Sequence, residues 1–332
     1  MRMLQPFRLL VLFLLLAVNT LAQASPTLVG TRYVASSNLV VAPGQIVRLQ
    51  VTGLSTVLPS PAVQKATSVP LPTSLAGISV TVRQFFRLSL HDTPQPLEPH
   101  KAPLLMVNQI DSCSSSFSPA CLITYITAQI PYELGVIGGS LYYSTEIVIS
   151  ENNLDSKPFF VSAVYDQMHV VTACDREDIQ AAGCAAIVTH ADGSQVSAQS
   201  PATPGEVVVV YAWGLGNTSP PVTTGELTPT PAPVSSIPGY PFGVAVRLDF
   251  APNAAPSFLY ENPPSLTAMP YLTPGQIGLY QINVKLPSSF PPVPACTTSE
   301  AIGYLGIVSN LTINLRGPYS HDGAAICVRP TQ

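Results

Sequence analysis

The sequence predicts an all-β fold in which two β-sandwiches in tandem follow a cleaved signal peptide. Three observations support this prediction: apolar and polar residues alternate in short runs, proline and glycine separate the runs, and one pattern of residues occurs twice. The chain contains 35 prolines, which break helices and mark loops and strand edges. Many short strands between Pro and Gly turns are typical of sandwiches and barrels.

The start of the chain has the features of a secretory signal. Arg2 and Arg8 give it positive charge, residues 9–18 form an unbroken apolar run, and residues 21–24 offer the small-x-small pattern that signal peptidase recognises. The apolar run is shorter than the roughly 20 residues of a membrane-spanning helix. We therefore expect cleavage after Ala24 and export by the general secretory route. The mature chain is expected to have no transmembrane segment and to lie in the periplasm, on the cell surface or outside the cell.

The mature chain is acidic and poor in charged residues. Cleavage removes Arg2 and Arg8 from the 14 basic residues and leaves all 18 acidic ones, and only 10% of the whole chain is charged. Nucleic acids and anionic lipids are bound by clustered Lys and Arg, so the composition argues against both as partners. The partner stays unidentified, with a surface polysaccharide or another extracellular protein as the candidates.

Period-two alternation indicates the strands in order along the chain. Residues 46–52, 78–83, 146–150 and 244–250 alternate apolar and polar side chains between Gly, Pro or Ser residues. Residues 207–211 are instead a continuous apolar run rich in valine, which predicts a strand buried on both faces.

Two Pro-Gly motifs begin the repeated pattern. Pro43-Gly44 leads through a strand to Gly53-Leu54, and Pro204-Gly205 leads through a strand to Gly214-Leu215. Pro presets φ and Gly accepts a positive φ, so each Pro-Gly pair predicts a tight turn before the strand. The Gly-Leu pair after the strand permits a bend and supplies one large aliphatic side chain to the core.

The repeat extends over most of the chain and sets the expected domain boundaries. The apolar residues and proline of 123–131 are spaced like those of 279–287. A repeat this long indicates a duplicated domain rather than an array of short units. We expect a signal peptide at 1–24, a first sandwich at 25–165, a bridge that opens the second copy at 166–199, and a second sandwich at 200–332.

The order Pro-Gly, strand, Gly-Leu and later strands that end in Ile/Leu-Pro resembles the immunoglobulin-like TIG domain. In the second copy, residues 204–220, Gly225 and residues 274–287 are similar to the Solibacter-type uncharacterised C-terminal domain family, whose members are exported proteins of soil acidobacteria and their relatives. The resemblance implies immunoglobulin-like sandwiches and export. It implies no catalytic residue, because the family has none assigned. The first copy matches more loosely, at residues 42–44, 71–82 and 129–133.

The cysteines indicate disulfide bonds rather than a metal site. An even number in an exported chain is typical of disulfides, and no C-x-x-C pair or His at ligand spacing accompanies them. The sequence leaves the connectivity open. Pairing between neighbours in sequence is the simplest hypothesis: Cys113 with Cys121, Cys174 with Cys184, and Cys296 with Cys327.

The sequence predicts a non-catalytic protein with a structural, adhesive or assembly role and without a cofactor or metal. His91-Asp92 and His321-Asp322 look like fragments of a hydrolase triad, but no G-x-S-x-G motif accompanies them. An exported hydrolase of unrecognised type therefore stays an alternative. It requires a nucleophile within hydrogen-bond reach of a base, in a cleft.

Aromatic residues of the second copy provide a further alternative, a carbohydrate-binding module. Aromatic side chains near polar loops can stack on sugars, although core packing explains such residues equally well. The binding interpretation requires Trp213 to be exposed on one face rather than buried between the sheets. The candidate ligand-binding residues are Trp213, Tyr240, Phe242 and Tyr271.

Overall fold

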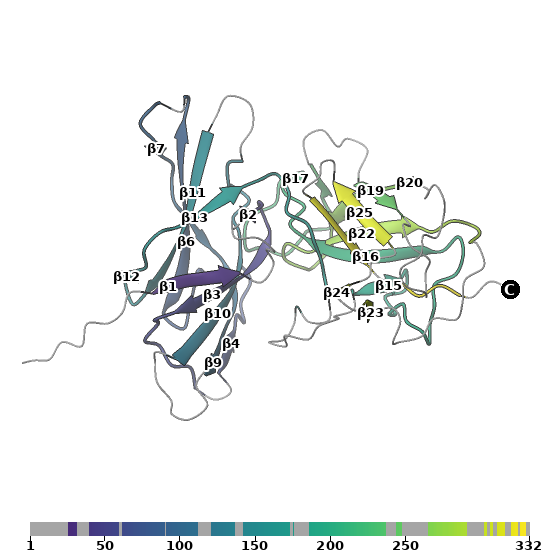
Figure 1. The fold of residues 1–332 in the computed structure, drawn as a ribbon, viewed down its shortest axis with the longest axis horizontal. Helices are drawn as coiled ribbons and strands as arrows, with labels where there is room; N and C mark the ends of the chain where they lie inside the picture. The colour runs from purple at the N-terminus through teal and green to yellow at the C-terminus, as the bar shows by residue number, and fades with distance from the viewer. Residues whose placement is uncertain are drawn as a thin grey trace, which may run out of the picture.

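The computed structural model shows an all-β protein (Figure 1). The described residues form strands β1 to β26 and no α-helix, and none of them belongs to a helix that could cross a membrane. The proposed signal segment lies outside these residues. The structure describes residues 26–31, 40–59, 62–89, 91–111, 121–136, 142–172, 175, 186–236, 244–247, 265–290, 302–303, 306–307, 311–315, 320–324 and 326–329.

Two sheets from the first half of the chain enclose one core, and we call them the first sheet pair. The five-stranded sheet has the order β1 (Thr27–Thr31), β3 (Ile46–Thr52), β10 (Leu122–Gln129), β9 (Leu104–Asp111) and β4 (Val63–Lys65). The eight-stranded sheet has the path β2 (Val40–Val41), β13 (Phe159–Ala163), β11 (Tyr142–Glu151), β6 (Ile78–Arg87) and β5 (Ser74–Leu75). Strands β7 (Gln95–Pro96), β8 (His100–Ala102) and β12 (Leu154–Asp155) attach to its side.

Alternation along the strands builds the first core. In β6, Ile78, Val80 and Val82 are buried, while the side chains between them are partly exposed. Successive side chains of a strand point to opposite faces, so these three point toward the facing sheet. The facing residues of the five-stranded sheet are apolar as well, which closes the core between the two sheets. They include Val47, Leu49, Val51, Ile126 and Ala128.

The second sheet pair is formed by described strands from β14 onward. Its seven-stranded sheet has the path β14 (His169–Val170), β16 (Val207–Trp213), β22 (Tyr280–Lys285), β21 (Pro270–Leu272), β18 (Val234–Ser235) and β17 (Thr218–Ser219), with β15 (Val188–His190) beside β16. Its four-stranded sheet has the order β20 (Ser265–Ala268), β19 (Val244–Arg247), β25 (Leu311–Leu315) and β26 (Ser320–Ala324). Strands β23 (Ile302–Gly303) and β24 (Gly306–Ile307) form a separate hairpin.

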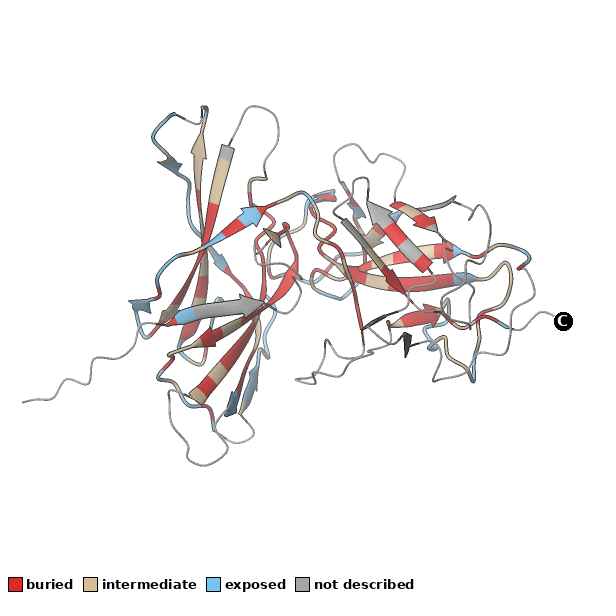
Figure 2. Cartoon of the chain, viewed as in Figure 1, coloured by how far each residue is buried: buried red, intermediate tan, exposed pale blue. Residues whose placement is uncertain are grey.

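A second core lies between these two sheets. β16 contributes Val208, Val210 and Ala212, and Val246 and Ile313 come from the four-stranded sheet. Figure 2 shows the buried residues concentrated on the strands of each pair and in the region where the pairs meet. β14 and β15 both hydrogen-bond to β16, so the described strands of the expected bridge at 166–199 pack on the second core.

The strand predictions made from alternation are confirmed. β3 has the predicted bounds, 46–52. Residues 78–83 lie in β6, residues 146–150 lie in β11, and β19 covers 244–247 of the segment 244–250. The prediction that 207–211 is buried on both faces is wrong at its ends. Val207 is 36% exposed and Tyr211 is half-buried, because the outer face of β16 is open beside them.

The repeated Pro-Gly motif has the same local structure in both copies. Gly44 and Gly205 have φ values of 70° and 78°, in the left-handed region that favours glycine. The residue after each glycine caps the turn with its side chain. Oε1 of Gln45 accepts the N–H of Ala42 at 2.9 Å, and Oε2 of Glu206 accepts the N–H of Thr203 at 2.7 Å. The turn predicted from the sequence is confirmed at both places.

A tyrosine after β10 joins the two sheet pairs. The ring of Tyr132 covers Gly44 so closely that a Cβ at position 44 would lie 2.1 Å from ring atom Cε1. Across the joint, Tyr280 of β22 is fully buried, and its hydroxyl donates a hydrogen bond to the carbonyl oxygen of Gly216. Burial raises the pKa of both tyrosines, and in Tyr280 the neighbouring Tyr132 adds to the effect. The two tyrosine side chains therefore lie near each other in a water-poor joint.

A turn of the second half docks on the first sheet pair beside this tyrosine. The hydroxyl of Thr224 accepts the N–H of Tyr132 at 2.9 Å and donates to Glu133 at 2.7 Å. The N–H of Gly225 donates to the side-chain oxygen of Gln129 at 2.7 Å, and its carbonyl oxygen accepts the N–H of Leu71 at 2.9 Å. These four hydrogen bonds cross the joint and fix its register.

The joint predicts an unequal effect of two glycine substitutions. Gly278 and Gly275 have φ of 64° and 72°, so alanine strains the backbone at either position by about 1–2 kcal/mol. Only at Gly278 would the new Cβ lie 2.7 Å from the backbone oxygen of Gly44, whereas nothing lies within 4 Å of a Cβ at Gly275. Gly278→Ala should therefore lower the free energy of unfolding by a further ~1–3 kcal/mol relative to Gly275→Ala, measured by urea unfolding. Equal losses in the two variants would contradict the packing of the joint.

Candidate functional site

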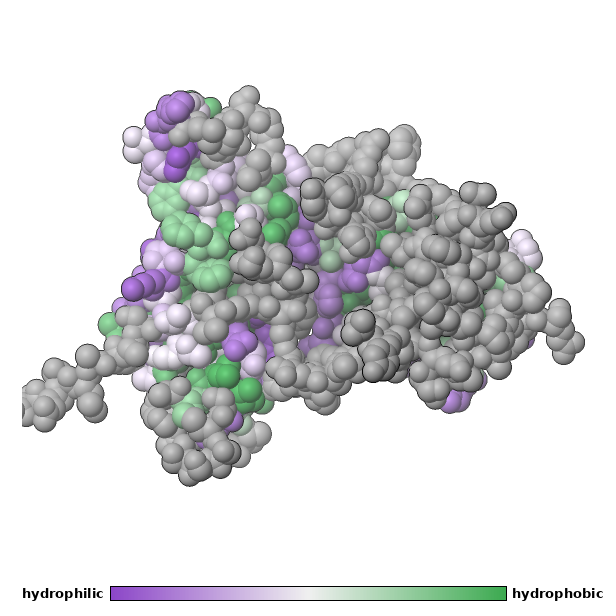
Figure 3. All heavy atoms as spheres, viewed as in Figure 1, coloured by the Kyte–Doolittle hydropathy of each residue, from purple (hydrophilic) through white to green (hydrophobic). Residues whose placement is uncertain are grey.

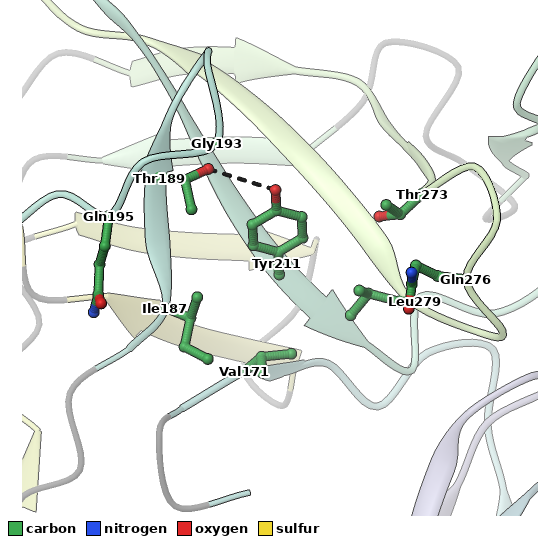
Figure 4. A pocket seen from close by; sticks show the side chains of 9 residues that line it. All are labelled: Val171, Ile187, Thr189, Gly193, Gln195, Tyr211, Thr273, Gln276 and Leu279. Atoms are coloured by element: carbon green, nitrogen blue, oxygen red, sulfur yellow. Dashed lines mark hydrogen bonds between the residues drawn. The ribbon is translucent and has the colours of Figure 1, made fainter. Parts of the chain in front are cut away.

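The outer face of the seven-stranded sheet carries a groove of about 590 Å³. Figure 4 shows the ring of Tyr211 at its centre, with Gln195 on one side and Thr273 and Gln276 on the other. The hydroxyl of Thr189 lies 3.4 Å from that of Tyr211. The groove is therefore an aromatic floor with hydroxyl and amide groups around it. Its lining residues are Val171, Ile187, Thr189, Gly193, Gln195, Tyr211, Thr273, Gln276 and Leu279.

Strand alternation places these side chains outward. Val208, Val210 and Ala212 of β16 point into the second core, so Val209, Tyr211 and Trp213 lie on the opposite face. The residues that pair with them on neighbouring strands extend the outer face across the sheet with polar and aromatic side chains. They are Asn283 opposite Val209, Gln281 opposite Tyr211, Tyr271 opposite Gln281, and His169 opposite Trp213.

A second groove, of about 500 Å³, lies where the two sheet pairs meet. Val171, Gln276 and Leu279 line both grooves, so the two adjoin each other. Trp213 and Leu227 line the second groove from one sheet pair. The other side is lined by Lys65 of β4, Met106 of β9 and Thr127 of β10. In the face of the molecule that Figure 3 presents, hydrophilic residues lie in the hollow between the two halves.

The ring of Trp213 stacks on the ring of a histidine. The rings of His169 and Trp213 are stacked, with centroids 6.0 Å apart and planes 27° apart. His169 in turn lies between two carboxylates, with Nε2 at 2.9 Å from Asp175 and Nδ1 at 3.5 Å from Asp322. Although burial opposes the charged form, the two carboxylates raise the pKa of His169 to about 9. At neutral pH, the histidine ring that stacks on Trp213 is therefore protonated.

The structure places two of the four aromatic residues predicted for ligand binding on one sheet face, and of these two Trp213 lines a groove. Trp213 and Tyr271 both lie half-buried on the outer face of the seven-stranded sheet, where Nδ2 of Asn283 donates to the hydroxyl of Tyr271 at 2.6 Å. Trp213 is not buried between the sheets, which is what the carbohydrate-binding alternative requires. Tyr240 and Phe242 lie outside the described residues.

Tyr211 is the site residue that the sequence reasoning missed. It ends an apolar run that was interpreted as buried on both faces. The useful signal was the spacing of Tyr211 and Trp213, because residues two apart in a strand share a face. That spacing, together with the exposure of Trp213 that the carbohydrate-binding alternative requires, places Tyr211 on the outer face as well.

Elsewhere in the second sheet pair, three side chains contact one another in a row: a serine, a histidine and a glutamate. Oγ of Ser200 lies 3.1 Å from Nε2 of His190, and Nδ1 of His190 contacts a carboxylate oxygen of Glu206. The structure thus contains the kind of nucleophile–base contact that the hydrolase alternative requires. None of the three residues lines either groove.

The remaining contacts favour a structural latch over a catalytic triad. Nε2 of His190 also lies 3.1 Å from the carbonyl oxygen of Ser200, a contact that needs Nε2 to carry a proton. The hydrogen bond to Glu206 raises the pKa of His190, which favours that protonated form. A protonated Nε2 cannot accept the serine proton. In the first copy, uncharged Gln45 caps the equivalent turn with the same kind of hydrogen bond. The capping role of Glu206 therefore requires no catalytic function.

The described parts of the dipeptides His91-Asp92 and His321-Asp322 make contacts with their surroundings, and the side chain of His321 lies outside the described residues. His91 is exposed, and its backbone N–H contacts Ser89 Oγ at 3.3 Å. Asp322 accepts the N–H of Val170 at 2.7 Å and supports His169, so it ties β26 to β14.

The cysteines are placed only in part. Cys121 and Cys327 are disulfide-bonded. Cys113, Cys174, Cys184 and Cys296 lie outside the described residues, so pairing between sequence neighbours stays a prediction. Within the described part of the chain, no three His, Cys, Asp or Glu side chains are grouped as a metal site would require.

Comparison with family models and with curated proteins found no match. The resemblance of the second copy to the Solibacter-type family therefore stays a prediction, and any function must be argued from the geometry.

The latch predicts a definite pH dependence of stability. The pKa of His190 is raised above 6.5, so its contribution is complete below that pH and is lost as the pH rises through the raised pKa. Burial opposes ionisation of Glu206, but its bonds to Thr203 and His190 outweigh burial and lower its pKa below 4.5. The difference in unfolding free energy between wild type and His190→Gln should thus be largest between pH 4.5 and 6.5. Chemical denaturation at a series of pH values measures it.

A Ser200→Ala variant separates the latch from a nucleophile. The substitution keeps the carbonyl oxygen that contacts His190, so stability should change little, by less than about 0.5 kcal/mol. A fluorophosphonate probe should not label the wild-type protein at neutral pH. Labelling of wild type that Ser200→Ala abolishes would show that the serine is a nucleophile and would revive the hydrolase alternative.

Proposed function

We propose that the protein is an exported, non-catalytic polysaccharide-binding protein with an adhesive or structural role, built from two immunoglobulin-like sandwiches. The observation that carries this proposal is the pair Tyr211 and Trp213, two residues apart on the outer face of β16, each lining one of two adjoining grooves. Export rests on the signal-like start of the chain, which lies outside the described residues.

The composition of the groove suits a sugar chain. Sugar rings offer an apolar face to an aromatic ring and hydroxyls at their rim, and the groove offers rings together with amides and hydroxyls. Tyr211 and Trp213 are two residues apart in a strand, so their attachment points are about 6–7 Å apart on a flat strip. An extended glycan whose successive sugar units face the strip fits such spacing better than a compact ligand would.

The open shape of the site supports binding rather than catalysis. The aromatic floor lies on a sheet face, and its hydroxyls and amides are neutral groups that can bond to a ligand but not transfer protons readily at neutral pH. Asp175, a carboxylate that lines the second groove, already accepts the N–H of Thr172 at 2.6 Å and contacts His169. An extended peptide is the competing ligand, and the test below includes it.

The proposal predicts loss of binding when either ring is removed. Tyr211→Ala and Trp213→Ala should each weaken binding of cellohexaose, an extended β-linked glucan fragment, by about tenfold or more, since central aromatic residues dominate such interfaces. Isothermal titration calorimetry measures the affinities, after a glycan array has tested the mature protein for other sugars.

Phe160→Ala is the matched control for these variants. Phe160 is also an aromatic residue on a strand and is 71% exposed, but it belongs to β13 of the first sheet pair and lines neither groove. Its removal should leave affinity unchanged. The proposal fails if no glycan binds, if a peptide library binds instead, or if Phe160→Ala weakens binding as much as Tyr211→Ala does.

A further inference from the structure

His169 connects three separate parts of the second sheet pair. The residue lies in β14, Asp175 lies in the turn that follows, and Asp322 lies in β26 near the C-terminus. Each carboxylate also accepts a backbone N–H, Asp175 from Thr172 at 2.6 Å and Asp322 from Val170 at 2.7 Å. The carboxylates are therefore fixed by the backbone, and the imidazole is held between them.

The third neighbour of His169 is the ring of Trp213. The two rings stack at 6.0 Å, within the range at which a cation is attracted to an indole face. The imidazole is therefore the stacking partner of the indole, and Trp213 also lines the groove. In the described part of the chain, the ionisable groups in contact with His169 are Asp175 and Asp322, both acidic.

We propose that His169 is a positioning residue that holds the indole of Trp213 in the groove while it is protonated and releases it when it loses its proton. This inference rests on the proposed function for its binding consequence. An imidazolium can donate from both nitrogens and so serve both carboxylates, whereas a neutral imidazole keeps a single N–H. Deprotonation therefore breaks one of the two carboxylate contacts and removes the positive charge behind the indole.

The consequence for the groove is a loss of order and a change of charge. Asp175 lines the groove and its side chain is only 9% exposed, so loss of the positive charge on His169 removes a favourable interaction from a buried carboxylate. The turn that holds it would then relax toward water, next to Trp213. Since the pKa of His169 is raised to about 9, the arrangement is present at neutral pH and is lost as the pH rises through that value.

The fluorescence of Trp213 reports the state of His169 directly. Trp213 is the only tryptophan of the chain. A protonated imidazole stacked on an indole quenches its emission more strongly than a neutral one. Wild-type mature protein should therefore show an increase in emission with a midpoint near pH 9. His169→Gln should remove this transition, and His190→Gln, which changes a histidine away from Trp213, should keep it.

Asp322→Asn provides a second variant that preserves the fold. Its side-chain oxygen can still accept the N–H of Val170, but it no longer favours the imidazolium, so the fluorescence midpoint should fall below that of wild type. A wild-type titration without a transition near pH 9 would overturn the proposal. So would a transition that is unchanged in both His169→Gln and Asp322→Asn.

Cellohexaose binding tests the functional part. Its affinity for wild type should be about threefold weaker at pH 10 than at pH 7, as expected when a cation–π contact and its supporting bonds are lost. His169→Gln should show the weaker affinity at both pH values. Equal wild-type affinity at the two pH values would overturn the coupling to binding. Absence of binding at both pH values, with the fluorescence transition intact, would instead refute the proposed function and leave the positioning of Trp213 established.

Discussion

The packing of Tyr132 against Gly44 and Tyr280 is the contact on which the rest of the structure depends. The ring fits only because position 44 lacks a Cβ, and the same glycine allows the Pro-Gly turn before β3. The turn at Thr224 and Gly225 then pairs its polar groups with the first sheet pair. Two sheet pairs that are joined in this way cannot rotate freely, since rotation would expose buried tyrosines and leave buried polar groups unpaired. The groove lined from both sides of the joint exists only in this arrangement.

One strand supplies both the second core and the proposed binding face. The inward residues of β16 form the core, and its outward residues line the grooves. A strand in the middle of a packed sheet is held rigidly, so Tyr211 and Trp213 need little further ordering when a ligand binds, which favours affinity. Stacking on His169 also restricts the ring of Trp213, so this side chain too needs little further ordering when a ligand binds. The latch of Glu206 and His190 lies at the turn that precedes β16. It contributes to the stability of the fold and does not line the groove.

The sequence predicts the all-β class and the strands correctly, because period-two alternation is a local property that a sheet preserves. It predicts the Pro-Gly turns for a similar reason, since φ preference belongs to the residue itself. The site was predicted only in part. Tyr211 was missed because Val207 and Val209 make the outer face of β16 as apolar as the core face, which hides the alternation. The joint could not be predicted, because Tyr132, Gly44 and Tyr280 are far apart in sequence and no local pattern indicates that they meet. The same holds for His169, whose partner Asp322 comes from a distant strand.

Calorimetric unfolding of the mature chain tests most directly whether the two sheet pairs form one unit through Tyr132. The account predicts a single transition for wild type, with equal calorimetric and van't Hoff enthalpies, because neither pair can unfold without breaking the joint. Tyr132→Ala should divide this into two transitions, while Phe160→Ala should not. Two separate transitions in the wild-type protein, unchanged by Tyr132→Ala, would contradict the account, because the grooves would then lie between parts that move independently.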